Sequence, residues 1–110
     1  MDNTETFDFG QALSFLATGC MLARKGWNGQ NMFVFKTVGN TVSKDFIPKF
    51  VSLPDQVKAF LLSKGEDVVF KDSLTMYNAQ GEMQPGWHAS QSDMLATDWY
   101  LLPDPSAVAA

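Results

Sequence analysis

Two of the three tryptophans stand beside small and polar residues, in a pattern typical of a small-molecule site. Trp27 is followed by Asn28 and Gly29, and Trp87 is followed by His88. An indole offers a flat face for stacking, and neighbouring polar groups offer hydrogen-bond donors and acceptors. The alternative is that both indoles fill the core, because tryptophan is highly buried on average.

The sequence offers little for catalysis. His88 is the only histidine and the one candidate general base. It is not part of a Ser-His-Asp order or a G-x-S-x-G motif. Asp93 and Asp98 are a possible carboxylate pair, but Asp93 is better explained as part of a helix cap that begins at Ser90. We therefore expect a protein that is not an enzyme.

A basic pair, Arg24 and Lys25, directly precedes a turn that contains two glycines. Backbone amides in such a turn, together with a guanidinium, can hold one or two phosphate groups. The turn lacks the G-K-[ST] of a Walker loop and the G-x-G-x-x-G of a dinucleotide fingerprint. A solvated basic pair at a hairpin tip is an equally good interpretation.

A nucleotide is the ligand class that these residues favour, although their spacing does not select among nucleotides. Stacking of a base on an indole contributes roughly 1–3 kcal/mol. The side chains that can read base or ribose edges are those of Asn28, Ser90, Gln91 and Asp98.

Composition restricts the function classes. A chain of 110 residues with 45% hydrophobic and 18% charged residues is expected to form one globular domain, residues 1–110. Its net charge of −4 argues against duplex DNA or RNA, since such binding neutralises several phosphates with Lys and Arg. We also expect no membrane span, because no apolar run approaches about 20 residues.

The expected compartment is a reducing cytoplasm. The N-terminus lacks the basic and apolar regions of a signal peptide, and Cys20 has no second cysteine with which to pair. Cys20 is expected to be a buried apolar residue. One histidine and one cysteine do not make a zinc site, so we expect neither a metal nor a cofactor.

The first part of the chain predicts a helix followed by a hairpin. Apolar spacing indicates a helix at residues 9–18, with Asp8 as its N-cap and Gly19 in the left-handed position after it. Strands at residues 21–24 and 32–38 are expected to pair around the Trp-Asn-Gly turn.

A second helix is predicted at residues 53–64. Ser52 is the expected N-cap and Gly65 the expected end. Val57, Phe60 and Leu61 are expected on one face of the helix. The stretch before it, residues 41–50, has no clear pattern.

A short helix is predicted after Ser90, where Asp93 completes a capping box. Met94 and Leu95 are expected to form its buried face. Trp99 is assigned to the core together with Leu95, because an apolar strand surrounds it.

The remaining strand candidates are residues 67–70, 74–77, 82–84 and 98–102. Helices separate the strands irregularly, without a βαβ rhythm, so the predicted fold class is α+β, with one antiparallel sheet and short packed helices. The ordered part is expected to run from about residue 7 to 102, with flexible termini.

Three motifs in order resemble a known family. They are F-x-x-A-L-x-x-L-x-x-G at residues 9–19, R-x-G-W-N-G-x-x-M-F at residues 24–33 and G-W-x-A-S-Q-x-D-M-L-A-x-D-W at residues 86–99. The chain is identified by them as similar to the second Thoeris anti-defence family of phages and prophages. The resemblance covers about residues 9–99 and is weakest at residues 39–72.

The resemblance implies a sponge. Members bind the cyclic ADP-ribose isomers made by bacterial TIR-domain sensors without cleaving them, so the defence effector is starved of its signal. They are homotetramers with ligand pockets between subunits, and some also hold cyclic dinucleotides at a separate site. The implied location is the cytoplasm of an infected bacterial cell.

The matching motif positions imply a ligand site. Trp27 and Trp87 would stack on the adenine or close over the ligand. The first motif adds Arg24, Asn28 and Gly29 for the diphosphate or ribose. The second motif adds Ser90, Gln91 and Asp93, and Asp98 lies where a carboxylate could accept hydrogen bonds from ribose hydroxyls. The alternatives are a nucleotide-processing enzyme and a protein-interaction module that uses the tryptophan loops.

Overall fold

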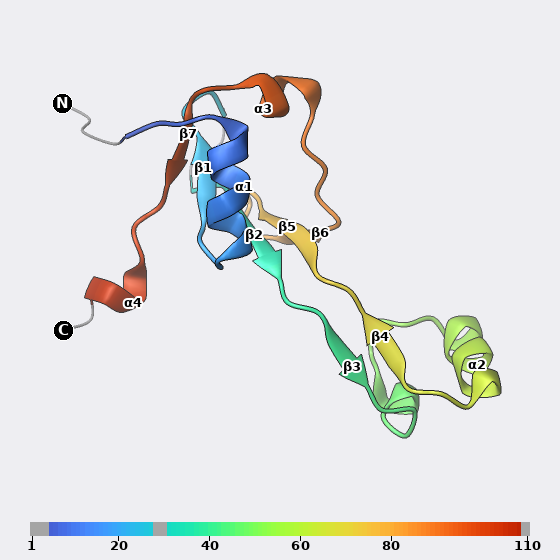
Figure 1. The fold of residues 1–110 in the computed structure, drawn as a ribbon. Coiled ribbons are helices and arrows are strands. Elements are labelled where there is room, and N and C mark those ends of the chain that lie inside the picture. Colours follow the sequence, from blue (N-terminus) through green and yellow to red (C-terminus); the bar gives the residue numbers. More distant parts are fainter. Residues whose placement is uncertain (1–4, 28–30, 109–110) are drawn as a thin grey trace. The chain divides into compact units, whose positions relative to one another are not determined.

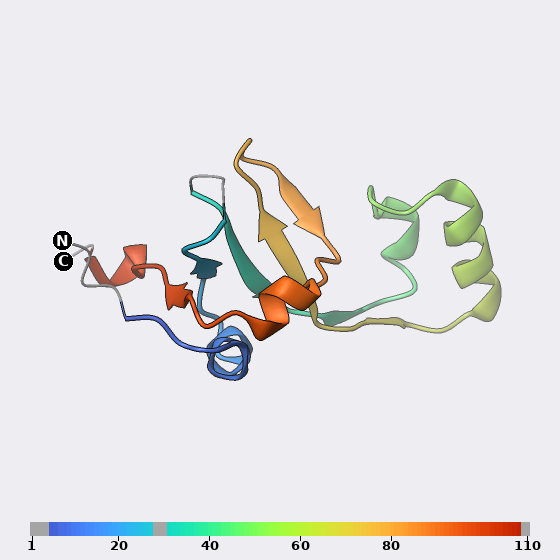
Figure 2. The same cartoon turned by 90° about the horizontal axis from the view of Figure 1, so that it is seen from above.

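The computed structural model describes residues 5–27 and 31–108 of the 110-residue chain. Figures 1 and 2 present its helices and strands in two views. Two compact units divide the chain: unit 1 is Met1–Thr37 with Ser73–Ala110, and unit 2 is Val38–Asp72. The fold class is α+β, as predicted; the assignment of residues 1–110 to one domain stays a prediction.

Unit 1 is built on a five-stranded antiparallel sheet with the order β6-β5-β2-β1-β7. Strand β1 pairs with β2, which confirms the predicted hairpin, and with β7 on its other side. Each strand of this sheet coincides with a predicted strand segment, but β5 begins one residue before its segment and β6 ends one residue after its segment. The strands are β1 (Leu22–Arg24), β2 (Phe33–Thr37), β5 (Ser73–Tyr77), β6 (Met83–Pro85) and β7 (Trp99–Leu101).

Helix α1 (Phe9–Ala17) lies on one face of this sheet (Figures 1 and 2). The N-cap carboxylate of Asp8 accepts a hydrogen bond from the Gln11 amide at 2.8 Å, and the Gln11 side chain accepts one from the Asp8 amide. Gly19 follows with a φ of 95°, which a residue without Cβ adopts readily. The first predicted helix and its caps are confirmed.

The core of unit 1 lies between α1 and the sheet. Residues of one strand face alternate in sequence, and this alternation turns buried side chains toward Ala12 and Leu16 of α1. Trp99 has no exposed surface, so its assignment to the core is confirmed. The core cluster consists of Ala12, Leu16, Leu22, Val34, Met76 and Trp99.

Helix α3 (Gln91–Leu95) buries a carboxylate instead of apolar side chains. Leu95 is 81% exposed and Met94 is 48% exposed, so the prediction that they form the buried face is wrong. A helix of five residues has few inward positions, and Asp93 occupies one of them because several hydrogen bonds hold it there.

Unit 2 contains a two-stranded antiparallel sheet of β3 (Asn40–Val42) and β4 (Val68–Phe70), a 3-10 turn at Ile47–Lys49 and helix α2 (Asp55–Lys64). Its buried apolar side chains are those of Val42 and Ile47.

Helix α2 begins two residues later than predicted. Pro54 is its N-cap and no side chain caps it, so the prediction that Ser52 caps the helix is wrong. A residue before proline avoids the helical region, which prevents Leu53 from starting the helix. Gly65 ends it in the left-handed conformation with a φ of 67°, as predicted. On its predicted apolar face Phe60 is 59% exposed.

The end of unit 1 carries one more helical turn. Helix α4 (Pro105–Val108) follows β7 in the tail that the sequence predicts to be flexible. Cys20, predicted to be buried, is half-buried and packs against the core. Among the helices that the structure describes, none combines the length and apolarity needed to cross a membrane.

Candidate functional site

Two carboxylates hold the guanidinium of Arg24. Arg24 Nη1 lies 2.8 Å from Asp93 Oδ1, and Arg24 Nε lies 2.8 Å from Asp98 Oδ1. Strand register brings these groups together, because Arg24 at the end of β1 pairs with Trp99 at the start of β7. The side chain of Arg24 is only 17% exposed, so these ion pairs are screened less than those of a solvent-exposed pair.

The same contacts shift the pKa values of all three groups. The Arg24 hydrogen bond is the main cause that lowers the pKa of Asp98. Burial acts to raise the pKa of Asp93, but hydrogen bonds from the Ser90 backbone, Arg24 and Trp27 outweigh it and hold that pKa below its ordinary value. The pKa of Arg24 is raised, chiefly by its hydrogen bond to Asp98. The cluster is therefore fully ionised at neutral pH.

Asp98 also fixes the backbone of the turn after β1. Its Oδ2 accepts a hydrogen bond from the Gly26 amide at 2.8 Å, and its carbonyl accepts one from the Lys25 amide at 3.0 Å. A Cβ on Gly26 would lie 3.0 Å from Asp98 Oδ2, which is too close for an ordinary contact. Glycine at this position allows the carboxylate to approach the chain.

The three tryptophans contact one another in edge-to-face geometry. Ring centroids are 5.4 Å apart for Trp27 and Trp99, 6.2 Å for Trp27 and Trp87, and 6.3 Å for Trp87 and Trp99. Such geometry places the positive ring edge of one indole against the negative face of another. Trp27 and Trp87 are half-buried and pack against the core, so each contributes to packing whatever else it does.

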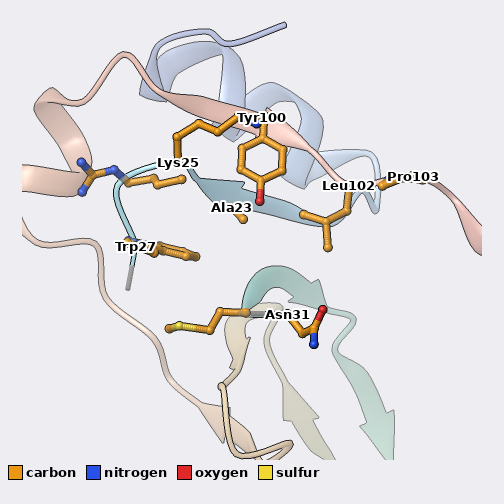
Figure 3. A pocket seen from close by; sticks show the side chains of 9 residues that line it. Ala23, Lys25, Trp27, Asn31, Tyr100, Leu102 and Pro103 are labelled. Carbon is orange, nitrogen blue, oxygen red and sulfur yellow. The ribbon is translucent and has the colours of Figure 1, made fainter. Parts of the chain in front are cut away.

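A pocket of about 510 Å³ opens beside Trp27, within the roughly 300–1,000 Å³ usual for small-molecule sites. Figure 3 shows Tyr100 and Leu102 on one side of it, with Trp27 and Asn31 opposite. Lys25 Nζ lies 4.5 Å from the centroid of the Tyr100 ring, a cation–π distance. The full lining is Ala23, Arg24, Lys25, Trp27, Asn31, Met32, Tyr100, Leu102 and Pro103.

Only some of the predicted site residues line the pocket, and the others that the structure describes lie elsewhere in unit 1. Arg24 and Trp27 line the pocket. Ser90 caps α3 through a hydrogen bond from the Asp93 amide, and Gln91 is the exposed first residue of that helix. Trp87, as described, packs among the tryptophans, and Asp98 binds Arg24 and the turn. Asn28 and Gly29 lie outside the described residues.

The sequence did not indicate several residues that line the pocket, among them Tyr100 and Asn31, whose side chains carry polar groups. Strand alternation was the available signal for Tyr100: since Trp99 points into the core, its neighbour must point to the opposite face of the sheet. Asn31 has a φ of 62°, a left-handed conformation that asparagine tolerates better than most residues. Nothing in the sequence pattern singles out Asn31 as a wall of the pocket.

The residues that the structure describes do not form a metal site. Within residues 5–27 and 31–108, no three His, Cys, Asp or Glu side chains are grouped to hold a metal ion. His88, the candidate general base, is exposed.

Fold and site define the class: a small α+β protein whose candidate pocket combines aromatic and cationic side chains beside a partly buried charge cluster. Residues 7–102 match the model of the Thoeris anti-defense 2-like domain, and the chain belongs to that family. It is also 31% identical over 97 residues to Thoeris anti-defense 2 of Bacillus phage SP01, covering 86% of this chain and 92% of the relative. The family resemblance inferred from the three motifs is therefore confirmed, and it assigns the chain to anti-defence proteins directed at Thoeris.

Proposed function

We propose that the protein is a sponge, which binds and sequesters a cyclic ADP-ribose isomer made by a TIR-domain sensor without cleaving it. It would act in the cytoplasm of an infected bacterial cell and deprive the Thoeris effector of its signal. The observation that carries the proposal is the pocket of Trp27, Tyr100, Lys25 and Arg24 in a member of this family.

The pocket's chemistry suits the parts of such a ligand. The adenine is flat and stacks on an indole or phenol ring, for which Trp27 and Tyr100 are available. The diphosphate is anionic and would lie near the ammonium of Lys25 and the guanidinium of Arg24. Asn31 offers an amide for a ribose hydroxyl. Because Asp93 and Asp98 already offset the charge of Arg24, attraction of the diphosphate would depend on directed, charge-assisted hydrogen bonds rather than on a net positive charge.

The remaining predicted residues enter the proposal in two roles. Asn28 and Gly29 follow Trp27 in the sequence and would approach the diphosphate or ribose. Trp87, Ser90, Gln91 and Asp98 would contact the ligand directly or support those that do. For Ser90 and Asp98 support is the better proposal, because the helix cap and Arg24 already occupy their oxygens.

Self-association into a tetramer belongs to the proposal, with the ligand held between subunits. Unit 2 supports it, because a compact unit that consists of Val38–Asp72 is too small to bury a large apolar core of its own. Unit 2 buries the apolar side chains of Val42 and Ile47, yet Phe60 is 59% exposed and Val69 is 65% exposed. A second copy of the chain would cover such surface. A separate cyclic-dinucleotide site remains part of the proposal.

Incubation with each cyclic ADP-ribose isomer, followed by removal of free ligand and heat extraction, tests the sponge. Intact isomer should return in an amount that matches the protein sites. Cleaved product would identify an enzyme instead. Absence of binding, with a protein partner required for activity, would identify an interaction module. The Trp27→Ala variant serves as the control for binding at the pocket, and a parallel incubation with cyclic dinucleotides tests for the second site.

A further inference from the structure

Trp27 forms part of the wall of two separate hollows in unit 1. Its indole lines the 510 Å³ pocket described above and also a second hollow of about 390 Å³. The second hollow is lined by Trp27, Met32, Met76, Asn78, Ala79, Gln80 and Gln84. A rotation of the indole would therefore change the wall of both spaces, so the ring must be held in one orientation if the pocket is to keep its shape.

One hydrogen bond gives the indole a direction. Trp27 Nε1 donates to Asp93 Oδ1 at 3.2 Å. The edge-to-face contacts with Trp87 and Trp99 tolerate a range of tilts, because ring quadrupoles constrain geometry only weakly. The N–H donor has a narrow angular preference, and it points the indole toward Asp93.

Asp93 is itself held on every side. Its Oδ1 also accepts from Arg24 Nη1 at 2.8 Å, and its Oδ2 accepts from the Ser90 amide at 3.0 Å. Its amide donates to Ser90 Oγ, and its carbonyl accepts from Trp99 Nε1 at 2.9 Å. With 8% of its surface exposed, the carboxylate is a fixed acceptor.

We propose that Asp93 is a positioning residue: its carboxylate holds the Trp27 indole in the orientation that the ligand pocket requires. The inference rests on the proposed function. It assigns Asp93 no contact with the ligand. The competing explanation is that Asp93 only stabilises α3 and the fold, in which case its effect on binding would not depend on the indole N–H.

A double-mutant cycle separates the two explanations. Asp93→Asn keeps the size of the side chain but replaces one acceptor with a donor. Trp27→Phe keeps an aromatic face but lacks the N–H. Affinity for the cyclic ADP-ribose isomers is measured by calorimetry for the wild type, both single variants and the double variant. Asp45→Asn, the same charge change at an exposed residue of unit 2, is the matched control.

If Asp93 acts through Trp27, Asp93→Asn should weaken binding about tenfold in the wild type and less than about twofold in the Trp27→Phe background. Equal losses in the two backgrounds would overturn the positioning role. So would an unchanged affinity of Asp93→Asn while the wild type binds. If the wild type does not bind the isomers at all, the proposed function fails and this inference fails with it. That outcome is distinguishable from the two above, in which the wild type binds and only the positioning role is overturned.

Two measurements keep the test decisive if Asp93→Asn does not fold. Replacement of Trp27 with benzothienylalanine keeps the bicyclic ring and removes only the N–H; it should lose about as much affinity as Asp93→Asn, about tenfold. Unchanged affinity would contradict the inference. In NMR spectra of the wild type, the Trp27 indole N–H resonance should shift as Asp93 is protonated by acid. An indole resonance that does not shift during this titration would also contradict the positioning role of Asp93.

Discussion

Arg24 lines the candidate pocket, but a ligand would have to compete with protein groups for its guanidinium. Its guanidinium is already shared by Asp93 and Asp98 at 2.8 Å each. A hydrogen bond to a charged group contributes about 1.5–3 kcal/mol, and a phosphate must compete with contacts of that strength. The guanidinium that lines the pocket therefore already has its charge offset by two carboxylates of the protein itself.

The three tryptophans provide a test at the residue scale. Trp99→Ala should lower the free energy of unfolding by about 3–5 kcal/mol, because it empties a fully buried site. Trp27→Ala should instead weaken ligand binding by roughly 1–3 kcal/mol through the lost stacking surface. Its loss of stability should be smaller, since Trp27 is only half-buried. Chemical denaturation and calorimetric titration measure the two quantities.

Trp87→Ala is the informative third variant. Trp87 does not line the 510 Å³ pocket but contacts Trp27, which does, so Trp87→Ala should lower stability and weaken binding less than Trp27→Ala does, provided that each variant keeps its oligomer mass. Equal destabilisation by Trp27→Ala and Trp99→Ala would favour the interpretation of both as core residues. The ligand site would then have to lie elsewhere.

Acid should weaken the fold through Asp93 and Asp98. Both have a pKa below the ordinary value in the folded state, so their stabilising contribution is complete above the unfolded pKa of about 3.9. It is lost as pH falls below that value toward the folded pKa. Urea denaturation between pH 3 and 6, values chosen to bracket that of about 3.9, should show an acid limb that Asp98→Asn flattens and Asp45→Asn leaves in place. An equal loss of stability at acid pH in the wild type, Asp98→Asn and Asp45→Asn would contradict a stabilising role of the Asp98 carboxylate.

At the scale of elements, α3 depends on its cap. Five residues are too few to form a stable helix alone, and Ser90 supplies the acceptor for the Asp93 amide at 3.1 Å. Ser90→Ala should therefore cost about 0.5–2 kcal/mol of stability. Ser92, exposed in the same helix, gives the matched control Ser92→Ala. Equal denaturation midpoints for both variants would mean that the cap does not stabilise α3.

The elements that the sequence predicts well are those set by local rules. Asp8 and Gln11 form a cap across three residues, Gly65 ends α2, and β-branched and aromatic runs form strands close to their predicted bounds. The helix start misplaced at Ser52 has a local cause too, since Pro54 restricts the residue before it. Local signals sufficed for most of the secondary structure.

The parts that could not be predicted depend on contacts between distant segments. Arg24 meets Asp93 and Asp98 across 69 and 74 positions of the sequence, and no spacing rule reveals that pairing. The same contact explains why Asp93 is buried and Leu95 is not. The pocket, too, combines the turn after β1 with the end of β7, so its walls follow from the sheet register rather than from a motif.

At the scale of the whole molecule, small size makes assembly a physical expectation. A protein of 12.2 kDa buries a smaller fraction of its surface than a larger one. Contacts between copies add apolar burial, and symmetric homo-oligomers are the commonest solution. In unit 2, helix α2 has no buried residue, so its stability is expected to depend on what covers it.

The last prediction couples assembly to binding. Light scattering at micromolar concentration should report a multimer, most simply a tetramer. Phe60→Ser, on the exposed face of α2, should shift the mass toward smaller species because it removes apolar surface available to a second copy.

If the ligand pocket is completed by a neighbouring subunit, affinity must fall together with mass. Phe60→Ser should then bind the cyclic ADP-ribose isomers more weakly at concentrations where it dissociates, and recover affinity at concentrations where it reassembles, since assembly and binding are linked. A monomeric wild type would contradict both assembly and a shared pocket. A dissociated Phe60→Ser variant with full affinity would leave assembly intact as a property of the protein and would locate the whole binding site within one chain, at Trp27 and Tyr100.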